Sequence, residues 1–225
     1  LSLKEVAALD AVVQTAREQV AIEVLLGHGW RQIELRRITA GDVRSVKDGL
    51  VLCHGKERRE FAPILSETHH LLLELAGNLR DGDIVVRSER VRNGRTDPLG
   101  EDGVAQMLDR LFARAGLEAR GHDLRRTFCT LVYDACGDEF LANRLIRDVN
   151  PGCSDRYLKV PLAKLLRDLE LLSPLRQIRR TARRGGAEPL RQAGETMGQA
   201  EESMVETGES RTPRPEELAQ DILQA

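Results

Sequence analysis

The sequence has few aromatic residues and no long apolar segment. Aromatic side chains make up only 3% of its 225 residues, and the chain has two tyrosines, Tyr133 and Tyr157. Every apolar run falls well short of the roughly 20 residues that a membrane helix requires. The first ten residues, LSLKEVAALD, also lack the basic and apolar regions of a secretory signal. We therefore expect a soluble protein without a membrane partner.

Cysteines are also few, and their positions give no pattern of a metal site or a disulfide framework. The four residues lie far apart, at Cys53, Cys129, Cys136 and Cys153. The chain contains no C-x-x-C pair and no cluster of histidines beside a cysteine. This pattern favours buried free thiols in a reducing cytoplasm over disulfides or zinc.

The chain has no strong excess of charge, which at first argues against a nucleic-acid partner. Its formal net charge is −2. The balance is uneven, however, because residues 192–225 hold eight acidic residues against Arg211 and Arg214. The remaining 191 residues therefore carry a net charge of +4. Such a body is compatible with DNA binding but does not by itself indicate it.

Helical patterns dominate the chain, and short β-like segments cluster near residue 50. Ser2 with Glu5 forms a capping-box pattern that predicts a helix to about residue 16. We predict further helices over residues 16–30, 66–78, 101–115, 122–136, 138–147 and 152–171. Three antiparallel strands are predicted at 43–46, 50–54 and 59–64, with one further short strand at 84–87. The fold class is therefore mixed α/β, mostly α-helical with a small antiparallel three-stranded sheet.

The composition changes after Leu172, where we place the end of a folded domain spanning residues 1–172. The composition of residues 173–225 predicts a polar, disordered tail with an arginine-rich first part and an acidic second part. A short helix is expected at 216–224. The arginine-rich part is either an arm that contacts DNA or a solvated linker, and the sequence leaves both open.

Five residues that suit phosphate chemistry follow one another along the chain. They are Arg31 in HGWRQIEL, Lys56 in GKERREFAPI, His122 and Arg125 in HDLRRTF, and Tyr157 in SDRYLKV. Each has an ordinary structural explanation when taken alone, such as a surface arginine or an aromatic anchor. Their order and spacing as a set are hard to explain by chance.

Together these motifs resemble the catalytic domain of the tyrosine recombinases, the phage integrase family. HGWRQIEL is similar to the family's T-G-L-R-x-x-E-L, and HDLRRTF to its H-x-L-R-H-T-F. The 32 residues from Arg125 to Tyr157 also fit the family. The resemblance covers about residues 1–172 and implies the tyrosine recombinase catalytic-domain fold. The resemblance also implies an origin in a prokaryote, a phage or another mobile element. The family's N-terminal DNA-binding domain has no counterpart in this sequence, so we expect it to be absent.

The resemblance assigns a role to each of the five residues. Arg31 and Arg125 would grip the phosphate, because guanidiniums bind phosphate oxygens bidentately and stay charged. Tyr157 would be the nucleophile and His122 would transfer a proton near it. Lys56 would protonate the departing 5′ oxygen. The product would be a 3′-phosphotyrosyl link, made without metal, ATP or another cofactor.

Two neighbouring residues depart from the family pattern. Asp148 stands nine residues before Tyr157, where the family usually has His or Trp. An ionised carboxylate repels a phosphate instead of donating to it. Arg147 could supply the lost donor, the site could be impaired, or Asp148 could simply organise the turn before Pro151. Glu34 is expected to be structural and to brace the loop around Arg31.

The sequence therefore predicts a site-specific recombinase or integrase that cleaves and rejoins double-stranded DNA. A nucleoid-associated location follows from that partner. The alternative is a catalytically impaired relative that acts as a DNA-binding or assembly module.

Residues 161–172 carry an apolar stripe of leucines. The resemblance implies that they form a helix that docks on a neighbouring protomer in a homotetramer. The other reading is that this helix folds back onto its own core. Tyr133, beside Phe128 on an apolar stripe, is predicted to pack in the core.

Overall fold

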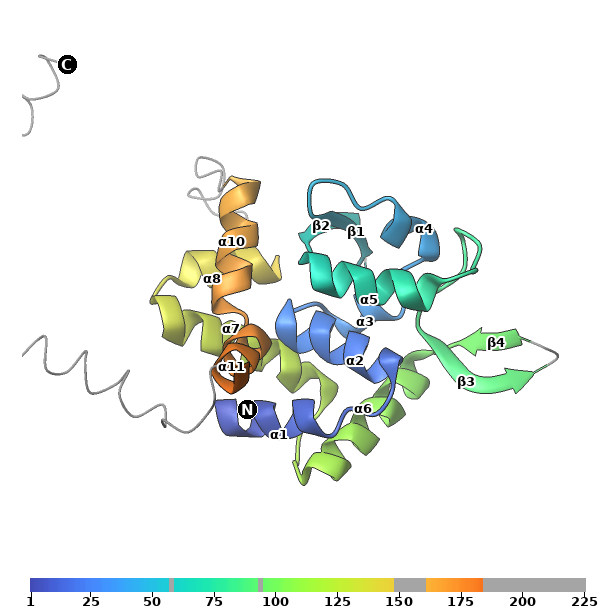
Figure 1. The fold of residues 1–225 in the computed structure, drawn as a ribbon, viewed down its shortest axis with the longest axis horizontal. Helices are drawn as coiled ribbons and strands as arrows, with labels where there is room; N and C mark the ends of the chain where they lie inside the picture. The colour runs from blue at the N-terminus through green and yellow to red at the C-terminus, as the bar shows by residue number, and fades with distance from the viewer. Residues whose placement is uncertain (57–58, 93–94, 148–160, 184–225) are drawn as a thin grey trace, which may run out of the picture. The chain divides into compact units, whose positions relative to one another are not determined.

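The computed structural model describes residues 1–56, 59–92, 95–147 and 161–183, and residues 1–183 form one compact unit (Figure 1). The α-helices in these ranges are α1 (Leu3–Ala11), α2 (Ala16–Ile22), α3 (Gln32–Leu35), α4 (Ala40–Arg44), α5 (Ser66–Ala76), α6 (Glu101–Ala115), α7 (Gly121–Cys136), α8 (Glu139–Ile146), α10 (Leu162–Leu172) and α11 (Pro174–Arg183). A π-helix, η1 (Glu23–Gly27), continues directly from α2. The strands are β1 (Leu50–His54), β2 (Arg59–Pro63), β3 (Arg87–Arg92) and β4 (Arg95–Pro98).

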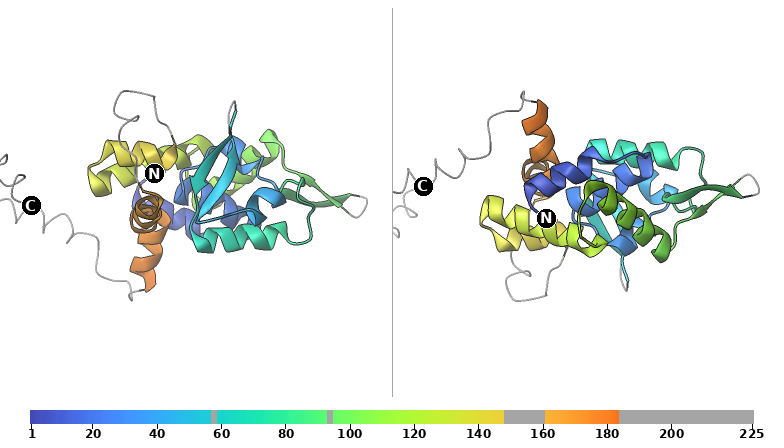
Figure 2. Two further views of the ribbon diagram at one scale, coloured as in Figure 1. Left: turned by 90° about the horizontal axis from the view of Figure 1, so that it is seen from above. Right: turned by 90° about the horizontal axis from the view of Figure 1, so that it is seen from below.

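The predicted fold class is confirmed, since the described chain is mostly helical with small antiparallel sheets. Strand β1 pairs with β2 from Leu50↔Pro63 to His54↔Arg59. Strand β3 pairs with β4 in a second two-stranded sheet. This hairpin projects from one end of the unit (Figure 1), as the two further views also show (Figure 2). The strand expected at 84–87 begins only at Arg87.

The strand predicted at 43–46 is wrong. Thr39 caps α4, and its hydroxyl accepts a hydrogen bond from the backbone N–H of Asp42, whose carboxylate accepts one from the Thr39 N–H in return. This capping box outweighs the local β-like pattern. After α4, only an isolated bridge joins Lys47 to Leu50.

Two clusters of buried side chains form the core, and they meet near residue 29. The larger one includes Trp30, which is fully buried, and the apolar faces of α1, α2 and α6. The smaller one gathers Phe128 and Val132 of α7, Leu145 of α8 and Leu169 of α10. Tyr133 is 46% exposed, so the prediction that it packs in the core is wrong. Phe128 and Val132 occupy the buried face of α7 instead.

Helix α10 packs on its own chain. Leu169 is 1% exposed and lies in the smaller cluster. An added Cβ at Gly49, in the turn before β1, would meet the Leu166 side chain at 2.7 Å. Of the two readings of this leucine stripe, the structure shows the one in which the helix folds back.

The disordered tail was expected to start at residue 173, but helix α11 follows α10 there. Residues 174–183 are helical, with Leu175 fully buried against the larger cluster. The arginine content suggested disorder, but Arg176, Arg179 and Arg180 all form ion pairs with carboxylates of the folded unit. The helix expected at 216–224 lies outside the described residues.

Two further observations bear on the general class of the protein. In the part of the chain that the structure describes, no helix is long and apolar enough to cross a bilayer. Cys53, Cys129 and Cys136 are free thiols, but only Cys53 is buried as predicted, and Cys129 and Cys136 are partly exposed. Burial raises the pKa of the Cys53 thiol. Cys153 lies outside the described residues.

Candidate active site

The candidate site is built around a short segment that joins η1 to α3. We call residues 28–31 the arginine loop, because it ends in Arg31, the N-cap residue of α3. Gly29 has φ +65°, and a Cβ there would lie 2.5 Å from Phe128 and 2.8 Å from Ile146. Only glycine allows this backbone conformation and this close approach. The loop therefore lies directly against α7 and the end of α8.

Arg125 joins those three elements through its guanidinium. The side chain lies on α7 and the residue is 7% exposed. Its Nη1 donates to the carbonyl oxygen of Gly29 at 2.5 Å, and its Nη2 donates to the carbonyl oxygen of Ile146 at 2.7 Å. A buried guanidinium with two carbonyl acceptors has little rotational freedom left, so Arg125 is fixed before any ligand arrives.

Glu34 holds the other side of the loop. Its carboxylate is buried, accepts from the backbone N–H of Arg31 at 2.8 Å and pairs with Arg31 Nη1 at 3.3 Å. Burial alone would raise the pKa of Glu34, but Arg147 and the contacts with Arg31 hold the pKa below its ordinary value. Glu34 is therefore ionised at neutral pH and braces the loop, in agreement with the structural role expected for it.

Arg147 is the second partner of Glu34. It ends α8 in the left-handed conformation, at φ 57°, and is 7% exposed. Its Nη2 donates to the Glu34 carboxylate, and its Nε lies 3.9 Å from a carboxylate oxygen of Glu60. Nε and Nη1 have no hydrogen-bond partner among the described residues. Arg147 thus lies within the ion-pair network that supports Arg31.

These contacts close into a ring that we call the arginine network. Its members follow one another through hydrogen bonds, ion pairs and a peptide bond: Gly29, Arg125, Ile146, Arg147, Glu34 and Arg31. The backbone of Trp30 closes the ring between Arg31 and Gly29. The Arg31 side chain keeps 31% of its surface exposed, so it can still reach a ligand. A positive group held in place by buried partners is well suited to stabilise developing negative charge.

His122 lies in the first turn of α7, one turn before Arg125, and is exposed. The neighbouring Gly121 packs so closely on Gln32 of α3 that a Cβ would not fit. The beginnings of α7 and α3 are therefore side by side, which places His122 at the same end of the two helices as Arg31.

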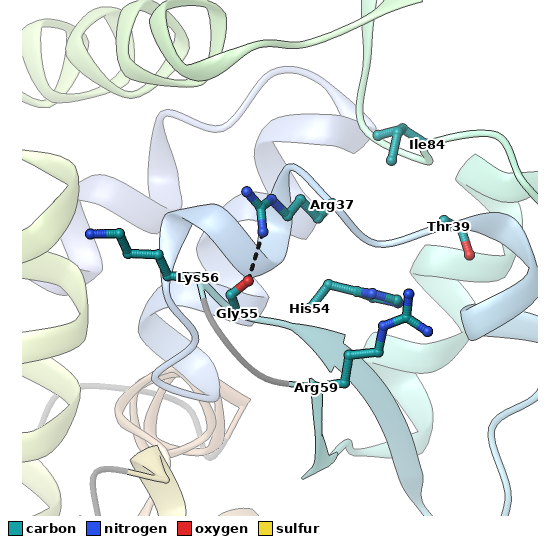
Figure 3. Close-up of a pocket in the computed structure, with 7 residues that line it drawn as sticks. All are labelled: Arg37, Thr39, His54, Gly55, Lys56, Arg59 and Ile84. Carbon is teal, nitrogen blue, oxygen red and sulfur yellow. Dashed lines mark hydrogen bonds between the residues drawn. The ribbon is translucent and has the colours of Figure 1, made fainter.

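Lys56 follows β1 in the β1–β2 hairpin and is exposed beside two open clefts. The first, of about 520 Å³, is shown in Figure 3 and is lined by Arg37, Thr39, His54, Gly55, Lys56, Arg59 and Ile84. Lys56 extends away from His54 and Arg59 in this view. The second, of about 430 Å³, is lined by Gln32, Ile33, Arg36, Arg37, Lys56, Glu101 and Val104. Gln32 follows Arg31 directly, so this second cleft reaches the start of α3.

Sequence reasoning missed the basic residues around Lys56. Arg37 donates from Nη1 to the carbonyl oxygen of Gly55 at 2.7 Å and lines both clefts. Arg36 pairs with Glu101 at 2.9 Å, and Arg59 faces the first cleft. The signal was present in the pairs Arg36–Arg37 and Arg58–Arg59, which flank the motifs singled out above.

Tyr157 and Asp148 lie outside the described residues, so their positions relative to the arginine network stay predictions. The described residues nearest to them in sequence are Arg147, within that network, and Pro161. In the described part of the chain, no three His, Cys, Asp or Glu side chains gather as a metal site.

Comparison with known proteins gives one family and several related folds. A model described as the phage integrase family matches residues 1–145. Tyrosine recombinase XerA of Pyrococcus horikoshii is 27% identical over 173 residues, which are 76% of this chain and 60% of the relative. The chain thus spans less than two thirds of the length of this relative.

Solved structures are similar to the described fold at lower sequence identity. The integrase from mycobacterium phage Brujita has a TM-score of 0.59 at 18% identity, over 78% of this chain and 58% of that one. A XerA recombinase structure has a TM-score of 0.55 at 20% identity, over 76% of this chain and 62% of that one. XerH site-specific recombinase bound to its difH substrate has a TM-score of 0.50 at 19% identity, over 66% of this chain and 45% of that one. At these identities the likeness shows the fold alone.

Proposed function

The chain belongs to the phage integrase family, and from this premise we propose that it cuts and rejoins double-stranded DNA as a site-specific recombinase. The observation that carries the proposal is the arginine network. It fixes Arg125 inside the protein and leaves Arg31 partly exposed, beside the end of α7 that bears His122. Two fixed guanidiniums beside a histidine suit a phosphodiester, whose transition state gathers charge on its non-bridging oxygens.

In the proposed reaction, the Tyr157 hydroxyl oxygen attacks the scissile phosphorus. A bond forms between phosphorus and the tyrosine oxygen, and the bond to the 5′ oxygen breaks. The tyrosine proton passes to the imidazole of His122, and Lys56 supplies a proton to the departing 5′ oxygen. Arg31 and Arg125 balance the charge on the phosphate. Because the 3′-phosphotyrosyl bond keeps the energy of the broken one, attack by a 5′ hydroxyl reverses the step without ATP or a metal.

Double-stranded DNA is the proposed partner. XerH, which shares the fold, is described in complex with its difH substrate. In the present chain the clefts beside Lys56 are lined by Arg37 and Arg59, which suit contacts with the phosphate backbone. A homotetramer on DNA is part of the proposal. It requires a surface other than the Leu169 face of α10, since that face is buried in its own protomer.

One observation favours a second candidate, a DNA-binding or assembly module with impaired catalysis. Asp148 occupies the position of the family's usual donor, and the neighbouring Arg147 already donates to Glu34. If Glu34 keeps the Arg147 guanidinium buried, its two nitrogens without a hydrogen-bond partner among the described residues stay inside the protein and do not replace the lost donor. Such a protein would bind DNA without forming a covalent link.

The two candidates differ in one product, a covalent complex between the protein and DNA. A nicked duplex that loses the short strand beyond the cleavage point would trap the phosphotyrosyl link. We expect an adduct with the unaltered chain and with Tyr133→Phe, since Tyr133 is a solvent-exposed residue of α7. Tyr157→Phe should form none while keeping its DNA affinity. An adduct that persists in Tyr157→Phe contradicts the assignment, and DNA binding with no adduct in any variant supports the second candidate.

A further inference from the structure

Helix α11 packs against the π-helix that leads into the arginine loop. All five residues of η1 are buried, and the loop follows without a break. A Cβ added at Gly27, the last residue of η1, would lie 3.2 Å from Leu175 of α11. Leu175 is itself fully buried. The last described helix therefore contacts the chain four residues before Arg31.

Ion pairs form a second link between η1 and α11. Glu23 begins η1, and its side chain is 2% exposed. The carboxylate pairs with Arg179, lies 3.8 Å from Arg176 and accepts a hydrogen bond from the Thr68 hydroxyl at 3.1 Å. Burial alone would raise the pKa of Glu23, but the charge and the hydrogen bond of Arg179 above all keep the pKa below its ordinary value. The carboxylate is thus charged inside the protein, and α11 supplies both of its cations.

Arg179 also ties this pair to the rest of the unit. Its Nη2 donates to Asp10 of α1 at 2.7 Å and its Nε donates to the same carboxylate at 3.0 Å. Arg176 pairs with Glu67 of α5 through a different nitrogen. Through these contacts α11 holds α1, η1 and α5 together, and Glu23 lies at the centre.

The backbone of η1 connects Glu23 to the arginine loop. The carbonyl oxygen of Glu23 accepts from Nδ1 of His28 at 2.8 Å, and His28 Nε2 accepts from the Leu65 N–H at 3.1 Å. The N–H of Trp30 donates to the carbonyl oxygen of Val24 at 2.8 Å. The first two residues of η1 therefore hold the residues on both sides of Gly29. A shift of Glu23 would be passed to the loop through these bonds.

We propose that Glu23 is a positioning residue for the arginine loop and that α11 is the clasp that keeps Glu23 in place. The part of the chain beyond the candidate nucleophile would thereby set the position of the phosphate-binding Arg31. This inference rests on the proposed function for its catalytic consequence, but its structural part does not depend on it. Without α11, the charged Glu23 would lie buried with no cation, and η1 would have to move toward water or take up a proton.

Hydrogen exchange tests the structural part without requiring activity. The variant is Arg179→Met, and the control is Arg180→Met on the same helix, which breaks a pair with Glu170 of α10 without touching Glu23. We expect the peptide covering residues 23–35 to exchange roughly tenfold faster in Arg179→Met and unchanged in Arg180→Met, with α6 unchanged in both. If Arg179→Met does not fold, Glu23→Gln, which keeps the side-chain volume, should give the same local change. Equal protection of residues 23–35 in all variants would overturn the clasp.

The catalytic part is tested on the nicked duplex at saturating DNA. Misplacement of Arg31 should slow adduct formation about tenfold to a hundredfold in Arg179→Met. DNA affinity should stay unchanged, Arg179→Lys should recover most of the rate, and Arg180→Met should behave like the unaltered chain. Equal slowing by Arg180→Met would show a general loss of stability and overturn the positioning role. If the unaltered chain forms no adduct, the proposed function fails, and the exchange data alone then decide whether α11 holds the loop.

Discussion

At the scale of single residues, the candidate site depends on charged side chains that are buried and paired. Glu34 and Arg147 are almost fully enclosed, and each would be costly to bury alone. Sequence motifs pointed to Arg31 and Arg125 as phosphate ligands, a role that stays a prediction, and to Glu34 as a brace, which its contacts with Arg31 support. The contact between Arg147 and Glu34 could not be predicted, since it joins residues 113 positions apart through the packing of α8 on the loop.

His28 gives a prediction about pH at this scale. Its ring is fully buried between the Glu23 carbonyl and the Leu65 N–H, and burial lowers its pKa from 6.5 to about 4. Between about pH 6.5 and pH 4, His28 therefore binds a proton in the unfolded chain but stays neutral in the folded chain. Stability contributed by neutral His28 is present at pH 7.5 and is lost as the pH falls toward 4. Between pH 7.5 and pH 5, we expect the free energy of unfolding to drop by about 2 kcal/mol from this group.

Urea unfolding of the unaltered chain and of His28→Gln at both pH values measures that drop. Other buried carboxylates, such as Glu34, also lose stability in acid, but they do so in both proteins. The contribution of His28 is therefore the difference between the two pH dependences. His28→Gln should be less stable at pH 7.5 and show a shallower loss toward pH 5. Parallel pH dependences would mean that the ring is not held neutral.

At the scale of elements, α10 and α11 show where sequence patterns were insufficient. The leucine stripe of α10 was clear, but periodicity does not say which surface covers an apolar face. The arginine content of α11 suggested disorder. Composition alone cannot show that these arginines pair with carboxylates distant in sequence, namely Glu23, Asp10 and Glu170. By contrast, α6 was predicted with its observed bounds, Glu101–Ala115, and it ends at Gly116 in the left-handed conformation.

Two leucines of α10 test the packing of this helix on its own chain. Leu169 is 1% exposed, whereas Leu171 is 51% exposed. Leu169→Ala should lower the free energy of unfolding of the isolated chain by about 2–5 kcal/mol, because it leaves a cavity against Phe128 and Val132. Leu171→Ala should change it by no more than about 0.5 kcal/mol. Urea titrations at low protein concentration measure both, and an unaffected Leu169→Ala monomer would show that the face is covered by another chain.

At the scale of the whole molecule, one folded unit brings together motifs that are almost 100 residues apart. The arginine loop and α7 meet because Gly29 allows the backbone to approach Phe128, and the Gly29 carbonyl accepts from Arg125 across 96 positions of sequence. The order of the motifs was enough to predict the family and the fold class. The support that α11 gives to the loop could be recognised only from the three-dimensional structure, because no local sequence pattern links residue 23 to residue 179.

The central claim is that Arg31 acts on the negative charge of a phosphate held at the arginine network. It is tested by the rate of adduct formation on two nicked duplexes, one with an ordinary phosphodiester and one with an uncharged methylphosphonate at the scissile position. Arg31→Ala should slow the reaction about 100- to 1,000-fold on the phosphodiester, but by less than about tenfold on the methylphosphonate, which lacks the charge to be neutralised. Arg44→Ala, which removes an arginine that pairs with Asp81 and lines neither cleft beside Lys56, should leave both rates nearly unchanged. An equal loss on both substrates with Arg31→Ala would contradict the account.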